Sequence, residues 1–305
     1  MVPVIIFTYV RLDHLKRTIT SLQNNILAEQ TDLFIASDSH RTESEADRVI
    51  AVRNYLRSVD GFKSVTIFER EKNFGMMENF YSGTKAIFNN HNRLIVLEED
   101  IVTAPGFLKF MNEAFEKYGG NEKVFSITGY CPPIKIPPSY QHDAFFLGRM
   151  NTWGCGITKD RYESVREITR KEFDEFTANK MKSRAFVKGG GNDLLRKLKK
   201  VAYGLTEAWD VQCMYTQFLK NQYTVYPTQS LTLNIGFDGT GVHCTKTDGF
   251  VVTLSDKTTF RFPDDPVVDP QIVKANLAFR NGTTIQRARA FVSGKTPEVI
   301  KQLLR

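Results

Sequence analysis

Arg93-Leu94-Ile95-Val96-Leu97-Glu98-Glu99-Asp100 joins an apolar run to three consecutive carboxylates. The apolar residues 94–97 predict a short strand buried on both faces, as in a parallel sheet. The adjacent carboxylates repel one another, so they need a cation, basic side chains or free exposure to water. In open α/β sheets, ligands bind just outside the carboxyl ends of the strands. Carboxylates there can hold Mg²⁺ or Mn²⁺ together with substrate phosphates, whereas a solvated acidic turn is the alternative interpretation.

The residues before this stretch alternate between strand patterns and helix patterns. The expected strands are residues 2–9, 32–38, 65–68 and 94–97, and the expected helices are 43–56, 80–88 and the segment after Asp13. This order predicts an α/β fold with a mostly parallel sheet flanked by helices. No Gly-rich phosphate loop follows the first strand, so an anionic ligand would have to be held by a metal and side chains.

The residues after Asp100 continue with further helix and strand patterns. We expect helices at 105–118, within the basic stretch 173–200 and from Trp209-Asp210 onward, and strands at 124–130 and 224–227. Gly189-Gly190-Gly191 has no strand before it, which predicts a flexible linker or a lid hinge. From Thr245 the pattern changes, with a β-like stretch at 250–254. Residues 245–305 are therefore expected to form an accessory segment, packed on the main domain or used for docking.

The composition is that of a globular protein with a basic excess. The chain has 305 residues, of which 41% are hydrophobic and 25% charged, and its four cysteines form no Cys-x-x-Cys pair. Neither a disulfide framework nor a zinc site is indicated, and we expect a reducing cytoplasm. The formal charge is +7, concentrated in residues 161–200 and in the C-terminal tail. Such a surface suits anionic lipid or glycan, or is simply solvated.

Six segments together resemble a known family. They are Val4–Arg11, Phe34–Asp38, Asn73-Phe74-Gly75, Leu94–Asp100, Trp209-Asp210 and the stretch from Asn234 to His243. The combination resembles GT-A-fold glycosyltransferases, more narrowly bacterial family-2-like sugar transferases, with a distant similarity to N-acetylglucosaminyltransferase I. The resemblance implies a GT-A (Rossmann-like) domain at 1–244, with a nucleotide-binding half at 1–100 and an acceptor half at 101–244.

The resemblance also implies a role for each matched residue. The residues implied at the nucleotide-sugar donor are Thr8, Arg11, Asp38, Asn73, Glu98 and Glu99, and those at the acceptor are Tyr130, Trp153 and Trp209. Asp210 would be the catalytic base, and Asp100 and His243 would hold Mn²⁺ or Mg²⁺. The family usually has aspartate where this chain has Glu99. Asp210 as an ordinary acid at a helix N-terminus, His243 as a loop histidine and Trp153 as a core residue are the alternatives.

These observations predict a metal-dependent inverting glycosyltransferase. It would move a sugar from a nucleotide-sugar donor, a UDP-sugar by preference, to a glycan or lipid-linked acceptor in bacterial surface polysaccharide synthesis. We expect a cytoplasmic protein whose basic segments contact the inner face of the cell membrane. No nucleic-acid partner is expected, because basic and aromatic residues do not interleave. The alternatives are a sugar nucleotidyltransferase, which would bring a Gly-rich basic loop, and a non-catalytic glycan-binding protein, which has no use for the carboxylates.

Overall fold

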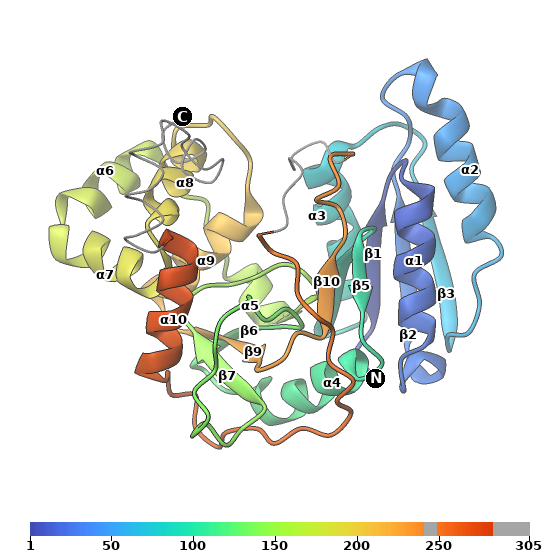
Figure 1. Ribbon diagram of the computed structural model, residues 1–305. Coiled ribbons are helices and arrows are strands. Elements are labelled where there is room, and N and C mark those ends of the chain that lie inside the picture. Colours follow the sequence, from blue (N-terminus) through green and yellow to red (C-terminus); the bar gives the residue numbers. More distant parts are fainter. Residues whose placement is uncertain (241–248, 283–305) are drawn as a thin grey trace, which may run out of the picture.

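A computed structural model describes residues 1–240 and 249–282, and it shows a twisted sheet with helices on both faces (Figure 1). Residues 1–100, the half predicted to bind the nucleotide, contain the parallel strands β1 (Val4–Thr8), β2 (Asp32–Ser37), β3 (Ser64–Glu69) and β4 (Arg93–Glu98). The helices that connect them are α1 (Leu12–Gln23), α2 (Ala46–Leu56) and α3 (Gly75–Phe88). Two short 3₁₀ turns, Ala28–Gln30 and Glu43–Glu45, precede β2 and α2. The expected alternation of strands and helices is confirmed.

The second half of the chain extends the same sheet in the order β3-β2-β1-β4-β8-β6-β9-β7. Its strands are β6 (Val124–Thr128), β7 (Ala144–Leu147), β8 (Cys155–Thr158) and β9 (Tyr223–Pro227). Only β8 and β7 run against the other strands, so the sheet is mostly parallel, as predicted. A separate antiparallel pair joins β5 (Ile101–Thr103), which follows the acidic stretch, to β10 (Thr232–Asn234).

The strands alternate their side chains between two hydrophobic cores, as a sheet covered on both faces requires. Val4, Ile6 and Leu97 pack on one face with α1, α2 and α4 (Phe107–Tyr118). Ile5 and Val96 pack on the other face with α3 and a helical layer from the second half. The helices of that layer are α5 (Lys159–Glu163), α6 (Arg170–Ala178), α7 (Lys180–Gly190), α8 (Asp193–Ala202) and α9 (Trp209–Leu219).

The triple-glycine segment is not the linker or hinge that we predicted. Gly189 and Gly190 continue α7, and only Gly191 leaves the helix, with a φ of +116°. A Cβ on Gly190 would lie 2.2 Å from Leu194 Cδ1 of α8. The glycines therefore permit α7 and α8 to approach each other and end α7 in a conformation that other residues rarely adopt.

The described part of the accessory segment packs on the main domain. Residues 250–254, expected to be β-like, lie in an irregular stretch outside both sheets, and α10 (Pro270–Asn281) follows. Buried Asp143 receives hydrogen bonds from the Arg261 backbone nitrogen and from Lys257 Nζ. In Figure 1 this stretch crosses in front of the sheet, and α10 lies beside α7.

Asp193→Asn is expected to destabilise the protein by about 3–5 kcal/mol, because it leaves buried Arg149 without its counter-charge. Arg149 donates to both Asp193 oxygens, at 2.7 and 2.9 Å. Burial alone would raise the pKa of Asp193, but the hydrogen bonds and charge of Arg149 lower it well below its ordinary 3.8. This stabilisation is therefore complete above pH 4 and is lost as the pH falls further. Urea unfolding of both proteins between pH 7 and pH 2.5 should show the difference shrinking only below about pH 4; a difference independent of pH would contradict the assignment.

Candidate functional site

The three carboxylates of the opening stretch have three different environments. Glu99 is 6% exposed, and both of its oxygens are already bound by the protein. Oε2 accepts from Thr8 Oγ1 at 2.7 Å and from the Tyr9 nitrogen at 2.6 Å, and Oε1 accepts from Arg11 Nε at 2.6 Å. These contacts join the ends of β1 and β4, which are paired from Val4–Ile95 to Phe7–Glu98. Glu99 thus holds Arg11 in place, and its predicted contact with the donor ribose stays a prediction.

Asp100 differs from Glu99 because one of its oxygens has no partner. Oδ2 accepts from Arg11 Nη2 at 2.7 Å, whereas buried Oδ1 has no hydrogen-bond partner among the described residues. Arg11 Nη1 is likewise buried and without a partner there. Burial opposes the charge of Arg11, but Asp100 and Glu99 outweigh this and raise its pKa above the ordinary value. The Arg11–Asp100 ion pair therefore carries two positions without a described partner: Asp100 Oδ1, which can bind a cation, and Arg11 Nη1, which can donate to an anion.

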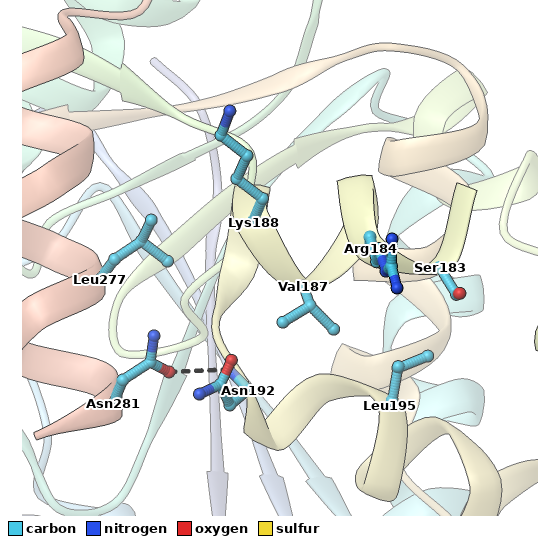
Figure 2. A pocket seen from close by; sticks show the side chains of 8 residues that line it. All are labelled: Ser183, Arg184, Val187, Lys188, Asn192, Leu195, Leu277 and Asn281. Carbon is cyan, nitrogen blue, oxygen red and sulfur yellow. Dashed lines mark hydrogen bonds between the residues drawn. The ribbon is translucent and has the colours of Figure 1, made fainter. Parts of the chain in front are cut away.

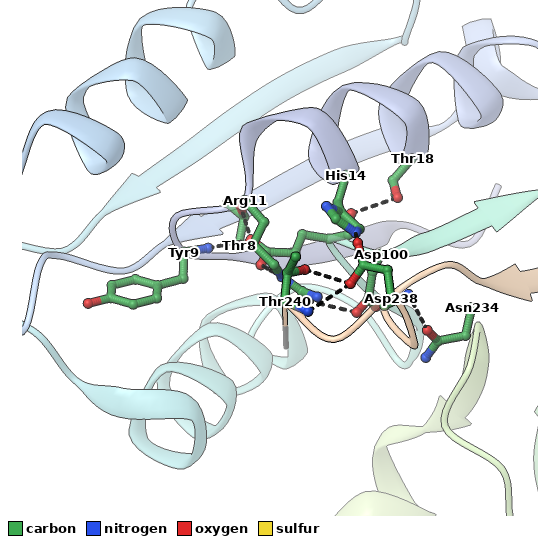
Figure 3. Close-up of polar contacts among 11 residues, drawn as sticks. Thr8, Tyr9, Arg11, His14, Thr18, Asp100, Asn234, Asp238 and Thr240 are labelled. Atoms are coloured by element: carbon green, nitrogen blue, oxygen red, sulfur yellow. Dashed lines mark hydrogen bonds and ion pairs between the residues drawn. The ribbon is translucent and has the colours of Figure 1, made fainter. Parts of the chain in front are cut away.

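The loop that follows β10 lies over this ion pair (Figure 3). The Ile235 nitrogen donates to the Asp100 carbonyl at 2.9 Å, and His14 Nε2 lies 3.1 Å from Asp238 Oδ2. A Cβ on Gly236 would lie 2.0 Å from Asp100 Oδ2 and 3.1 Å from Arg11 Nη1. Only glycine permits this close approach. Sequence reasoning identified the segment from 234 to 243 but missed His14, whose position three residues after Arg11 was its only signal.

Glu98 is the carboxylate that solvent reaches. Protein atoms nevertheless crowd around the side chain, and the resulting desolvation raises the pKa of Glu98 above its ordinary value of 4.5. The negative charge of Asp100 acts in the same direction, Arg11 opposes it, and the charges of Glu99 and Asp210 add to the increase. The charge of Asp210, at the start of α9, thus acts on the carboxylate that ends β4.

Asp210 lies in the first turn of α9, where a carboxylate favours the positive end of the helix. The side chain is half-buried, and no hydrogen bond or ion pair reaches it from residues 1–240 or 249–282. Trp209 beside it is 6% exposed and packs against Phe80 at a ring distance of 4.7 Å. Trp209 therefore anchors the start of α9 in the core and leaves the Asp210 carboxylate uncommitted. This packing covers the indole ring of Trp209. The acceptor role implied for Trp209 stays a prediction.

Asp38 and Asn73 bind one another at the end of β2. Asp38 accepts from the backbone nitrogens of Ser39, Phe74 and Gly75 at 2.8–2.9 Å and from Asn73 Nδ2 at 3.1 Å. These bonds position the first turn of α3. The Asp38 side chain is 5% exposed and is bound within the protein. Its predicted contact with the nucleoside stays a prediction.

Trp153 lies in an aromatic cluster that joins three parts of the chain. Its ring is 4.6 Å from that of Tyr130, 5.4 Å from Phe237 and 5.6 Å from Phe250. Tyr130 is fully buried, whereas Trp153 is half-buried. Trp153 is thus the acceptor candidate with an open surface, and the acceptor roles of both stay predictions. The sequence contained no signal that Phe237 and Phe250 would meet it.

The described residues can hold the predicted divalent cation only if a bound ligand supplies some of its coordinating oxygens. His243 lies outside the described residues, and within the described part no three His, Cys, Asp or Glu side chains gather as a metal cluster. Asp100 Oδ1 is one suitable oxygen. Mg²⁺ is commonly bound through one or two carboxylates, with waters and substrate phosphates as its other ligands. The donor set therefore suits a cation that arrives with a diphosphate.

No protein-family model matches the sequence, and no curated protein matches it either. Similar solved structures include TarS from S. aureus, at 10% identity and a TM-score of 0.44, covering 76% of this chain and 36% of that chain. They also include the mannosyltransferase PcManGT from Pyrobaculum calidifontis in complex with GDP-Man and Mn²⁺, at 9% identity and a TM-score of 0.36, covering 52% and 44%. Mouse xyloside xylosyltransferase 1 has 9% identity and a TM-score of 0.36, covering 71% and 80%. The chain thus spans about a third of the TarS structure. Likeness at this level carries no information about activity.

Proposed function

We propose that the protein is a metal-dependent inverting glycosyltransferase that uses a nucleotide-sugar donor, UDP-linked by preference, and a glycan or lipid-linked acceptor. The observation that carries the proposal is that two buried atoms, Asp100 Oδ1 and Arg11 Nη1, have no partner among residues 1–240 and 249–282. A divalent cation bound to a diphosphate offers a partner to each of them. A solvated acidic turn, the alternative for these carboxylates, does not account for two buried atoms without partners.

Each residue has a separate task in this proposal. Arg11 would bind the diphosphate end of the donor directly, and Asp100 would hold a divalent cation, which would neutralise the charge that develops on the leaving diphosphate. Asp210 accepts the proton of the acceptor hydroxyl while that oxygen forms its bond to the anomeric carbon. The bond between the anomeric carbon and the diphosphate oxygen breaks, and its electron pair remains on the diphosphate. Attack opposite the leaving group inverts the anomeric configuration.

The covered state of the two atoms requires that the loop carrying Gly236 moves before a donor can enter. Ile235 and Gly236 lie directly on the Asp100 and Arg11 pair, and among the described residues one ion pair joins the loop to α1, the partly exposed contact between His14 and Asp238. A contact at a partly exposed surface is weak, so breaking it adds little to the cost of moving the loop. The same loop can then close over the bound diphosphate and exclude water.

Thermal unfolding in the presence of nucleoside diphosphates tests the proposal. We expect one nucleoside diphosphate, UDP first, to raise the melting temperature only when Mn²⁺ or Mg²⁺ is present, because ligands that bind the folded state stabilise it. Nucleoside triphosphates and UDP without metal serve as controls. A response to triphosphates alone would favour a nucleotidyltransferase. No response to any nucleotide with either metal would refute the proposal.

A further inference from the structure

The helices α7 and α8 carry the basic excess of the protein. Residues 180–200 contain eight Lys and Arg residues and a single carboxylate, a net charge equal to the +7 of the whole chain. That carboxylate, Asp193, is bound to Arg149 and Lys197. Six of the cations are exposed and have no ion pair with any described residue, namely Lys180, Lys182, Arg184, Lys188, Lys199 and Lys200. Such unpaired charge attracts anions and is not explained by the packing of the fold.

A pocket of about 330 Å³ lies within this basic region, between α7, α8 and α10 (Figure 2). Its apolar lining is Val187, Leu195 and Leu277, and its polar lining is Ser183, Arg184, Lys188, Asn192 and Asn281. No carboxylate is part of this lining. In Figure 2, Leu277 of α10 lies across from Val187 of α7, and Asn281 accepts a hydrogen bond from the Asn192 backbone. The pocket thus combines cations with an apolar wall, which suits an anionic group attached to a hydrocarbon.

The side chains around the pocket favour a lipid surface over a nucleic acid. Met181 is 78% exposed and lies between Lys180 and Lys182 at the start of α7. An exposed apolar side chain flanked by lysines is typical of helices that bind at a membrane interface. The only aromatic residue within 180–200, Phe186, is 1% exposed and cannot stack on bases. Within the described residues, no helix combines the length and apolar character needed to cross a bilayer.

We propose that α7 and α8 bind the anionic phosphate headgroups of a lipid bilayer, with one headgroup in the pocket beside α10. This proposal deepens the proposed function. One consequence rests on that function, namely that the acceptor is lipid-linked. α8 ends at Ala202, and Asp210 follows within the first turn of α9. The segment from Ala202 to Asp210 spans at most about 29 Å when extended. Docking through α7 and α8 would therefore hold Asp210 near acceptors that are anchored in the bilayer.

Sedimentation of the full chain with lipid vesicles tests the proposal in the absence of nucleotide and metal. We expect binding to phosphatidylcholine vesicles that contain phosphatidylglycerol, weak binding to phosphatidylcholine alone, and loss of binding at high salt. The triple variant Lys182→Glu, Arg184→Glu, Lys188→Glu should bind at least about 100-fold more weakly, since each basic residue near the surface contributes about 1 kcal/mol. Met181→Ser should bind about ten-fold more weakly, because it removes an apolar side chain that enters the bilayer on docking.

A matched control separates docking at α7 and α8 from a general effect of charge. The triple variant Lys85→Glu, Lys123→Glu, Lys220→Glu makes the same charge change at exposed lysines that have no ion pair with a described residue. It should retain nearly all vesicle binding. Equal loss in both triple variants would overturn the proposal.

Two further arms identify the ligand. Stabilisation by soluble glycerol phosphate without vesicle binding would assign the pocket to a free phosphate compound and overturn membrane docking. Stronger binding to a single-stranded oligonucleotide than to anionic vesicles would also overturn it. The nucleotide-dependent melting shift should be unchanged in the α7 variant. Vesicle binding without any nucleotide response would refute the proposed function and leave the docking surface intact.

Discussion

Asp210→Asn is expected to lower the rate of sugar transfer by about 10²–10⁴-fold while donor binding stays near normal. The amide cannot accept the proton of the acceptor hydroxyl, so the step that forms the new bond loses its base. The fold should be unaffected, because no described residue bonds to the Asp210 side chain and Trp209 still anchors the helix. Release of nucleoside diphosphate measures turnover, and the metal-dependent melting shift measures donor binding.

Asp47→Asn is the matched control for Asp210→Asn. Asp47 lies in the first turn of α2, is exposed and has no ion pair with a described residue. Loss of an acid at a helix N-terminus costs about 0.3–1 kcal/mol of stability at either position. Only the Asp210 variant should lose transfer. If donor binding and transfer fell together in that variant, Asp210 would be a donor ligand and another residue would be the base.

Asp100→Asn is expected to abolish the part of nucleotide stabilisation that depends on metal. The amide has no negative charge, so the oxygen at the Oδ1 position becomes a poor ligand for a divalent cation. Arg11 would lose one of its two carboxylates, and a partly buried ion pair broken in this way costs up to about 3–5 kcal/mol of stability. A titration of Mn²⁺ followed by electron paramagnetic resonance, with UDP present, reports the metal without requiring activity.

Glu99→Gln is the comparison for Asp100→Asn. Both Glu99 oxygens are occupied by Thr8, Tyr9 and Arg11, so we expect lower stability with the Mn²⁺ response retained. Equal Mn²⁺ binding by the Asp100 variant and the unaltered protein would exclude Asp100 as a metal ligand. Loss of Mn²⁺ binding in the Glu99 variant alone would reverse the roles of the two carboxylates.

Patterns along the chain predicted most of the sheet and its connecting helices, but they misassigned two segments of the second half. Apolar runs at the first four strands and the alternation with helices were sufficient for the parallel half, because a strand buried on both faces has a distinctive composition. The triple glycine was misinterpreted, because glycine also occurs where two helices approach closely, as Gly190 and Leu194 do. The stretch at 250–254 resembled a strand, yet none of the strands in residues 1–240 and 249–282 pairs with it.

The sequence by itself determined the α/β class, the mostly parallel sheet and the position of three carboxylates at the end of its central strand. Only the tertiary structure decided which partners each of those carboxylates has and how far each is exposed. The parallel register that sets Phe7 beside Glu98 brings Arg11 onto Glu99 and Asp100, which are 88 and 89 residues away in the chain. The tertiary structure also places Gly236 over Asp100 and packs Tyr130 and Trp209 in the interior. Contacts between distant segments depend on how strands pair and helices pack, and local sequence patterns do not record them.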